Sequence, residues 1–551
     1  MKHSDSIFWV CGRSYRPNAS PLHRLKLDKT DIIQNDITSH LSPLTQQPMT
    51  VEYDLIIIGG SKAGIYAALT ATYLKARVAL IESQDIQTES LENSILYNRV
   101  FTQVGNVLQQ VRNAPQFGIQ FPTSDTTQEE QIPSVKLSDA MEWANAVVSN
   151  CAEQMSPVML ASLGVDVISG DGEFCRLPYL GFIVNNRRLR SRSYLIATGY
   201  RPIIPNINGL ATVDYCTPID IWQKGKLGTE NTGKINIAEN IQLPNRWVVI
   251  GESYLGIELA QTLARLDYQV TLVISESHIL PEEDLESSRL IQAQLEAEGI
   301  RILTKSPVTQ IREIDGEKWI QAGNKAIEAD RILLAMGEEP NVQGLNLEGV
   351  GVKFSQAGLA LNDKLQTTNP RIYACGDLVG GSCGANIAQY QASIALKNAL
   401  FAPLFKVNYK EIPRTIFTQP QLARVGLTEE EARQRYGKNV LVVRQYFKTL
   451  DKGQILGETT GFCKFVVRQN GEILGASIVG VEASELIGII ALSIRHKIKV
   501  GDIADLAQVY PTFSEILQKT ALEWRRQRLL RNHTLQNLLE SFFNWRRGWS
   551  K

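Results

Sequence analysis

The spacing of apolar residues predicts a strand–helix–strand unit close to residue 54. Asp54–Ile58 is an apolar run that ends at two glycines, Ala63–Lys75 has helical spacing, and Arg77–Glu82 is a second strand-like run. A glycine turn between strand and helix is typical of a βαβ unit of the Rossmann type. The same order recurs at Arg246–Val249, Gly251–Gly256 and Val270–Ile274. We therefore expect an α/β chain with two dinucleotide-binding folds.

The first glycine loop has the residues that a dinucleotide pyrophosphate requires. Glycines allow a tight turn, and the N-terminus of the next helix presents free N–H groups to the phosphates. Glu82 follows by about twenty residues, where an acid accepts hydrogen bonds from the adenosine ribose. Ser61 replaces the middle glycine, and its small side chain predicts that the change is tolerated. The residues expected to bind this dinucleotide are Gly59, Gly60, Ser61, Ala63, Gly64 and Glu82.

The second glycine loop differs from the first in its charge. Glu252 lies where a pyrophosphate would pass, and two like charges about 4 Å apart cost roughly 4 kcal/mol at an effective dielectric constant near 20. Unless its side chain points away, it weakens binding. The second strand ends in Ile274 rather than an acid, with Glu276 two residues later, so the choice between NADH and NADPH stays open. The residues expected to bind here are Gly251, Ser253, Tyr254 and Gly256.

Composition limits the other classes of function. The 551 residues allow three or four domains, and 57 basic against 57 acidic residues give no field for nucleic acid. Seven scattered cysteines form no CxxC and no metal-binding cluster. No apolar run reaches the roughly 18 residues of a membrane-spanning helix. We expect a cytoplasmic protein that holds no metal.

The first fifty residues stand apart from this pattern. They are polar, and their first half is basic with little acid. One interpretation is an organellar transit peptide. We favour an extension, residues 1–50, that is disordered or does not belong to the mature chain, because Met49 precedes a natural start for a nucleotide-binding fold.

Three further motifs in the expected order complete a family pattern. They are Leu195–Pro202, Leu333–Asn341 and Ile372–Asp377, followed by 413–428, 473–480 and 510–515. From about Glu52 to Trp524 the chain resembles the pyridine nucleotide–disulfide oxidoreductases, the flavoproteins that include glutathione reductase, dihydrolipoyl dehydrogenase and mercuric reductase. The resemblance implies FAD in the first fold, NAD or NADP in the second, and a homodimer. The implied parts are 51–204 and 331–410 for the FAD domain, 205–330 for an inserted NAD(P) domain, and 411–524 for an α+β dimerisation domain.

The resemblance also assigns roles to single residues. Asp377, after Gly376, matches the acid that holds the ribityl chain of FAD, and Glu258 matches the acid that places the nicotinamide. Tyr254 matches a tyrosine that covers the flavin; as a lone residue, ordinary packing is the alternative. Arg99 replaces a lysine near flavin N5 or is a solvated surface residue. The cofactor set is completed by Thr198, Gly199 and Gly337.

The chain departs from the family where sulfur chemistry is expected. Members carry a Cys-x4-Cys pair after the first βαβ unit, but this sequence has no cysteine between Cys11 and Cys151. Tyr510 occupies the position of a histidine that acts with a glutamate, here Glu515. A tyrosine with a reference pKa near 10 is a poor base at neutral pH. The tyrosine alone decides little, because relatives of the mercuric reductase type also carry one, but the two losses together argue against disulfide reduction.

Three functions remain. We favour an FAD-dependent NAD(P)H oxidoreductase in which Glu258, Tyr510 and Glu515 are the catalytic candidates and a small acceptor such as a quinone takes the electrons directly. The alternative is a catalytically retired FAD-binding dimer that acts as a redox sensor or scaffold. A thiol reductase that uses distant cysteines, such as Cys151 or Cys175, is the least favoured.

The C-terminal segment, residues 525–551, extends beyond the family pattern. Its apolar residues recur at three- and four-residue steps: Leu535, Leu538, Phe542, Trp545 and Trp549. Arginines surround this stripe, against Glu540 as the acid. A basic amphipathic helix of this kind favours peripheral membrane contact. Packing against its own dimer or against a partner protein is the alternative.

Overall fold

The fold was described from a computed structural model of the chain. The structure describes residues 51–83, 86–120, 134–153, 155–222, 246–380 and 384–549, with the side chains of 86–92 excluded. The N-terminal extension predicted for residues 1–50 lies outside the described residues, as does Cys383.

A five-stranded parallel sheet forms the core of the first nucleotide-binding part. Its strand order is β19-β7-β1-β2-β3. The strands are β1 (Tyr53–Ile58), β2 (Val78–Glu82), β3 (Asp166–Ser169), β7 (Ser191–Ile196) and β19 (Ile372–Ala374). Because β19 comes from a segment almost 180 residues after β7, the sheet closes only after the chain has built a second domain.

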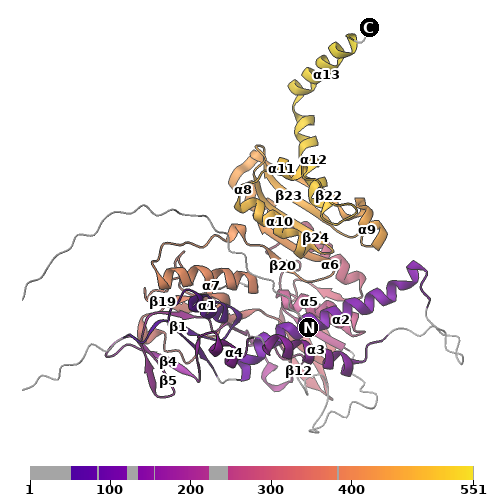
Figure 1. Cartoon of the computed structure of the whole chain (residues 1–551). Helices are drawn as coiled ribbons and strands as arrows, with labels where there is room; N and C mark the ends of the chain where they lie inside the picture. The colour runs from indigo at the N-terminus through magenta and orange to yellow at the C-terminus, as the bar shows by residue number, and fades with distance from the viewer. Residues whose placement is uncertain are drawn as a thin grey trace, which may run out of the picture. The chain divides into compact units, whose positions relative to one another are not determined.

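Each face of this sheet has its own cover. Alternate strand residues such as Leu55 and Ile57 pack against α1 and α7, which lie side by side in Figure 1. The opposite residues, such as Ile56, pack against a small antiparallel sheet through Phe174 and others. These covering elements are α1 (Lys62–Tyr73), α7 (Ala385–Leu400), β4 (Gly172–Cys175), β5 (Gly181–Val184) and β6 (Arg187–Leu189). Three more helices follow β2: α2 (Ile86–Asn113), α3 (Leu137–Glu153) and α4 (Pro157–Ser162).

The second nucleotide-binding part repeats this plan with four parallel strands in the order β11-β10-β9-β15. One face packs against α5 and the other against a three-stranded antiparallel sheet. The strands of the parallel sheet are β9 (Arg246–Ile250), β10 (Gln269–Val273), β11 (Arg301–Leu303) and β15 (Arg331–Leu334). The other elements are α5 (Tyr254–Arg265), α6 (Leu285–Ala297), β12 (Val308–Ile314), β13 (Glu317–Ala322) and β14 (Lys325–Ala329).

Short strand pairs join and flank these two parts. Strands β8 (Tyr200–Pro202) and β16 (Glu338–Pro340) run antiparallel where the chain leaves and re-enters the first part. A second pair is β17 (Phe354–Ser355) with β18 (Gly358–Leu359).

An antiparallel five-stranded sheet forms the C-terminal domain, in the order β20-β21-β24-β23-β22. Its strands are β20 (Arg414–Ile416), β21 (Gln421–Gly426), β22 (Val440–Tyr446), β23 (Phe462–Arg468) and β24 (Ile473–Gly480). The helices are α8 (Glu429–Tyr436), α9 (Asp451–Leu456), α10 (Ala483–Arg495), α11 (Val500–Ala504), α12 (Glu515–Arg531) and α13 (His533–Gly548). The α/β class with two Rossmann-like domains and an α+β C-terminal domain is confirmed.

The tail forms two helices rather than one. Helix α12 continues to Arg531, and its last buried residue is Trp524. Asn532 then accepts a hydrogen bond from the N–H of Leu535 and begins α13. No residue of α13 is buried. Among the described helices, none combines the length and apolar character that crossing a bilayer requires.

Candidate functional site

A large cavity lies at the carboxyl ends of the first parallel sheet. It has a volume of about 1490 Å³, and Gly59, Ile81 and Thr198 are among its lining residues. These residues end or follow β1, β2 and β7. Ligands of open α/β sheets bind outside the carboxyl ends of the strands. The cavity therefore lies at the edge where the sequence predicts a dinucleotide.

The first glycine loop leaves no room for side chains at two positions. A Cβ on Gly59, whose φ is +110°, would lie 2.3 Å from the carbonyl oxygen of Ala197. A Cβ on Gly64 would lie 2.2 Å from the carbonyl oxygen of Gly59. Ser61, which we expected only to be tolerated, accepts a hydrogen bond from the N–H of Gly64 at 3.3 Å and caps α1. The serine thus fixes the start of the helix that faces the pyrophosphate.

Glu82 lies against this loop. A Cβ on Gly60 would come within 2.8 Å of Glu82 Oε1, so the carboxylate lies directly over the second glycine. This is the arrangement in which an acid at the end of β2 receives ribose hydroxyls. The close-packed backbone and the carboxylate above it fit the adenosine diphosphate half of FAD.

The second FAD motif brings two carboxyl groups together. Gly376 begins the turn that contains Asp377, and its N–H donates to Gln391 Oε1 at 2.7 Å. Glu338 lies nearby on β16. Burial, and then the negative charge of Asp377, raise the pKa of Glu338 to about 8. Glu338 is therefore largely protonated at neutral pH, which limits the negative charge near the cofactor. Sequence reasoning missed Glu338, although it follows Gly337 directly.

The hydroxyl of Thr198 links the two halves of the FAD domain by donating to the carbonyl oxygen of Asn341 at 2.6 Å. Arg201 pairs with Glu339 across the β8–β16 ribbon at 2.6 Å. Gly199 and Gly337 both have positive φ, at 71° and 108°, where the chain turns into these strands. The two family-like turns are thus joined to each other beside the cavity.

The second glycine loop has the same backbone as the first. A Cβ on Gly251 would lie 2.3 Å from the carbonyl oxygen of Ala335, and one on Gly256 would lie 2.4 Å from Ala335 Cβ. Ser253 accepts from the N–H of Gly256 at 3.1 Å and caps α5. Burial, and then the negative charge of Glu276, raise the pKa of Glu252, while the nearby backbone N–H groups of Ser275 and Glu276 act against this shift. Because Ser275 and Glu276 follow β10, the carboxylate lies toward the end of that strand. Its effect on a pyrophosphate stays a prediction.

Glu258 is part of a buried cluster where α5 meets α2. It is 4% exposed and pairs with Arg99 Nη1 at 2.6 Å. Its other oxygen accepts from the N–H of Phe417 at 2.6 Å, and the Arg99 guanidinium lies 4.0 Å from the centre of the Phe417 ring. Glu258 is therefore not a surface acid, and Arg99 is held between Glu258 and Phe417 rather than surrounded by solvent. The role of Glu258 toward a nicotinamide stays a prediction.

Tyr254, which was predicted to bind the cofactors, and the catalytic candidates Tyr510 and Glu515 lie in different surroundings. The hydroxyl of Tyr254 donates to Glu282 at 3.1 Å. Tyr510 is 67% exposed, and its hydroxyl donates to Asp451 at 2.6 Å, which raises the tyrosine pKa. Glu515 accepts from the N–H of Thr512 at 2.9 Å, at the start of α12. The predicted roles of these residues, cofactor binding for Tyr254 and catalysis for Tyr510 and Glu515, also stay predictions.

The described cysteines are five separate thiols. Cys151 and Cys175 are partly exposed, whereas Cys216, Cys375 and Cys463 are buried, and none of these five described residues forms a disulfide. Burial raises the pKa of Cys463 to about 12, so its thiolate does not form at neutral pH. In the described ranges, no group of His, Cys, Asp and Glu side chains could hold a metal ion.

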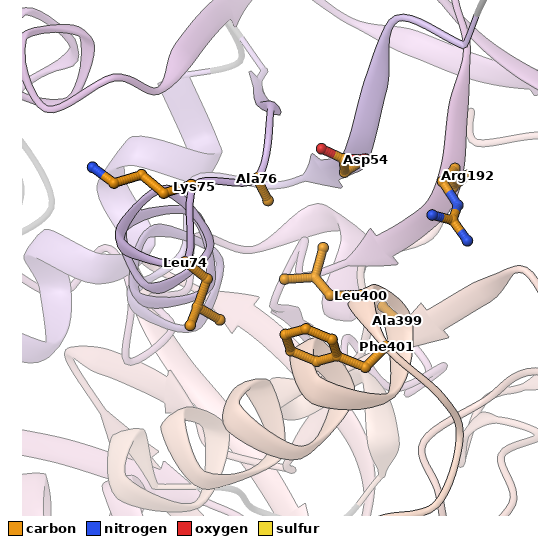
Figure 2. A pocket seen from close by; sticks show the side chains of 8 residues that line it. All are labelled: Asp54, Leu74, Lys75, Ala76, Arg192, Ala399, Leu400 and Phe401. Carbon is orange, nitrogen blue, oxygen red and sulfur yellow. The ribbon is translucent and has the colours of Figure 1, made fainter. Parts of the chain in front are cut away.

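A second cavity, of about 200 Å³, lies at the opposite end of the first sheet. Figure 2 shows its lining side chains, which come from the starts of β1 and β7 and from the ends of α1 and α7. The Asp54 carboxylate at this cavity accepts a hydrogen bond from the backbone N–H of Arg77 at 2.9 Å, which is a structural role. This cavity is separate from the dinucleotide edge.

Two glycine loops at two parallel sheets, joined to an antiparallel domain, are the arrangement of flavoprotein oxidoreductases with two dinucleotide-binding domains. Residues 53–395 match the pyridine nucleotide-disulphide oxidoreductase model, and residues 412–521 match the dimerisation domain of the same family. The chain belongs to this family, whose members use FAD and NAD(P)H. The dimerisation domain supports a homodimer.

Curated relatives and solved structures agree with this assignment. The chain is 30% identical over 478 residues to a mercuric reductase of Staphylococcus aureus, covering 86% of this chain and 82% of that protein. It is 30% identical over 476 residues to a dihydrolipoyl dehydrogenase of Bacillus subtilis strain 168, covering 85% and 98%. The fold matches the HOCl-induced flavoprotein disulfide reductase RclA of Escherichia coli with a TM-score of 0.70 at 23% identity, covering 85% and 99%.

Proposed function

We propose that this protein is an FAD-dependent NAD(P)H oxidoreductase that passes electrons from the flavin directly to a non-disulfide acceptor, such as a quinone. The observation that carries the proposal is the lack of any cysteine between Cys11 and Cys151, the stretch in which the family places its redox pair. A disulfide route requires a thiolate beside the flavin. Among the described residues, no two cysteines form a disulfide, which also favours a route without sulfur.

The chain's own residues would hold and orient the cofactors. FAD, when bound, supplies the two-electron chemistry between the nicotinamide and the acceptor. The first glycine loop and the capped N-terminus of α1 would receive its pyrophosphate, and Glu82 its ribose. Arg99 and Glu258 would fix the contact between α2 and α5, where the nicotinamide half of the second dinucleotide would approach. The apolar packing around this contact would keep water away from the reacting groups.

Anaerobic mixing of the purified yellow protein with NADH or NADPH tests the enzyme directly. We expect bleaching of the flavin band near neutral pH within seconds, and return of the colour on addition of a soluble quinone. Protein whose accessible thiols have been alkylated with iodoacetamide should keep both steps, because no thiol takes part. A flavin that neither nucleotide bleaches over minutes would instead favour the retired, cofactor-binding dimer. Loss of quinone reduction after alkylation would favour a thiol reductase.

We further propose that α13 makes peripheral contact with a membrane surface. Phe542, Trp545 and Trp549 are each at least 44% exposed, and their rings contact one another along one side of the helix. Arg546 and Arg547 lie in its last turn. Such a helix suits the interface between lipid headgroups and acyl chains. Arg525 and Arg526 add little positive charge to this surface, because they form ion pairs with Asp505 and Glu523.

Vesicle sedimentation tests this contact. Full-length protein should sediment with vesicles of phosphatidylcholine and phosphatidylglycerol at low salt. The double variant Phe542→Ser/Trp545→Ser should stay in the supernatant, because it loses two aromatic anchors. Asn537→Ser, on the polar side of α13, is the matched control and should sediment like the parent. Equal sedimentation of the parent and the double variant would overturn the proposal.

A further inference from the structure

The two glycine loops allow a residue-by-residue comparison within this one chain. Ile58 pairs with Ile81 in the first sheet, and Ile250 pairs with Val273 in the second. Gly59 and Gly251 therefore correspond, and both have a φ near +110°. One residue further on, Gly60 corresponds to Glu252. Glu82 follows Ile81 and Ile274 follows Val273, so Glu82 and Ile274 also correspond.

The comparison shows an exchange of side chains at one place. In the first loop the glycine leaves space, and the carboxylate of Glu82 fills it from the end of β2. In the second loop the strand-end residue is Ile274, an apolar side chain that is 1% exposed. Here the acid stands on the glycine loop instead, as Glu252, and its carboxylate lies close enough to Ser275 and Glu276, just past β10, for their backbone N–H groups to act on its pKa. Each site thus has one carboxylate between its glycine loop and the end of the neighbouring strand: Glu82 between Gly60 and β2, and Glu252 beside the end of β10.

We propose that Glu252 is the ribose-binding acid of the second dinucleotide site, and that it selects NADH over NADPH. The inference rests on the proposed function, since it assumes that a nicotinamide dinucleotide binds at this loop. One oxygen of Glu252, Oε2, is buried and has no hydrogen-bond partner in the protein. A vicinal ribose diol supplies two hydroxyl donors, which is what a carboxylate with an unused oxygen accepts.

Charge explains the selectivity. Glu276 is close enough to Glu252 that its negative charge, second to desolvation, raises the Glu252 pKa. A 2′-phosphate at this position would face two carboxylates, whereas a 2′-hydroxyl would donate to one of them. Lys305 is a cation on the neighbouring segment, and its backbone N–H donates to the carbonyl oxygen of Glu276 at 2.8 Å. Its side chain is exposed and would have to offset both acids for NADPH to bind well.

Calorimetric titration of the FAD-loaded protein with NAD⁺ and with NADP⁺ tests the assignment without turnover. The parent should bind NAD⁺ at least about tenfold more tightly than NADP⁺. Glu252→Gln keeps the size but removes the charge, and should weaken NAD⁺ binding about tenfold while strengthening NADP⁺ binding. Glu276→Gln, on the segment after β10, should leave NAD⁺ affinity within about twofold but strengthen NADP⁺ binding, because it removes one of the two carboxylates that a 2′-phosphate would face. Glu52→Gln, at a partly exposed acid of the first nucleotide-binding part, is the matched control and should change neither affinity. Thermal melts and the flavin spectrum verify that each variant is folded.

Three outcomes would contradict the proposal, and they differ in what they overturn. Equal or tighter binding of NADP⁺ by the parent would overturn the assignment of Glu252 alone. Glu252→Gly, which copies the first loop, should lose NAD⁺ affinity; tighter binding of both nucleotides by this variant would mean that Glu252 only obstructs the loop. Binding of neither nucleotide, together with no bleaching by either reduced form, would overturn the proposed function itself.

Discussion

Gly59→Ala is expected to leave the purified protein colourless. A Cβ at this position would lie 2.3 Å from the carbonyl oxygen of Ala197 and 2.7 Å from Cα of Thr198, both of which belong to backbone that cannot move aside cheaply. The φ of +110° adds strain of about 1–3 kcal/mol for a residue with a side chain. We expect the affinity for FAD to fall more than about 100-fold, equivalent to roughly 3 kcal/mol. The ratio of flavin to protein absorbance after dialysis measures it.

Gly164→Ala is the matched control for this prediction. Its φ of +94° imposes comparable backbone strain, but no atom lies within 4 Å of the added Cβ. It should keep its flavin and lose only stability. Gly60→Ala should fall between the two, because its added Cβ meets Glu82, a side chain that can rotate. If Gly59→Ala keeps FAD as firmly as Gly164→Ala, the loop does not hold the cofactor.

The sequence was sufficient for the architecture because the signals are local. Glycine loops, the apolar runs that precede them and the acid at Glu82 lie within about thirty residues of one another. The strand order then follows, since the family pattern places β19 after the inserted domain. The break in the tail at Asn532 was not predicted, although the side chain of Asn532, which accepts from the N–H of Leu535 and caps α13, is a local signal for it.

Side-chain directions at the site could not be predicted in the same way. Glu252 was expected to weaken pyrophosphate binding unless its side chain points away, and its direction depends on the segment that follows β10, where Glu276 and two backbone N–H groups act on its pKa. Arg99 and Glu258 are 159 residues apart, and only the packing of α2 on α5 makes them partners. The high pKa of Glu338 depends on burial and on Asp377, neither of which composition or spacing reveals. These features arise where segments far apart in the chain meet.

Removing the carboxylate of Glu258 should give the largest loss of stability among single charge changes near the site. Glu258→Ala leaves the Arg99 guanidinium and the N–H of Phe417 without the acceptor that each now contacts at 2.6 Å. Breaking a buried ion pair costs about 3–5 kcal/mol, and we expect the lower part of this range because the Arg99 side chain is 33% exposed. Alanine is a good helix former, so α5 itself should not weaken. Urea unfolding of the FAD-loaded protein measures the change.

Two further variants separate charge from hydrogen bonding at this cluster. Glu258→Gln keeps an acceptor for Phe417 but loses the ion pair, so its loss of stability should be about half that of alanine. Glu52→Gln breaks the Arg187–Glu52 pair, whose side chains are 57% and 38% exposed, and should cost less than about 1 kcal/mol. If Glu258→Ala costs no more than Glu52→Gln, the cluster does not fix α2 against α5. In that case, if flavin reduction is slowed about equally in Glu258→Ala and Glu258→Gln, the cause is not a shift of α2 relative to α5.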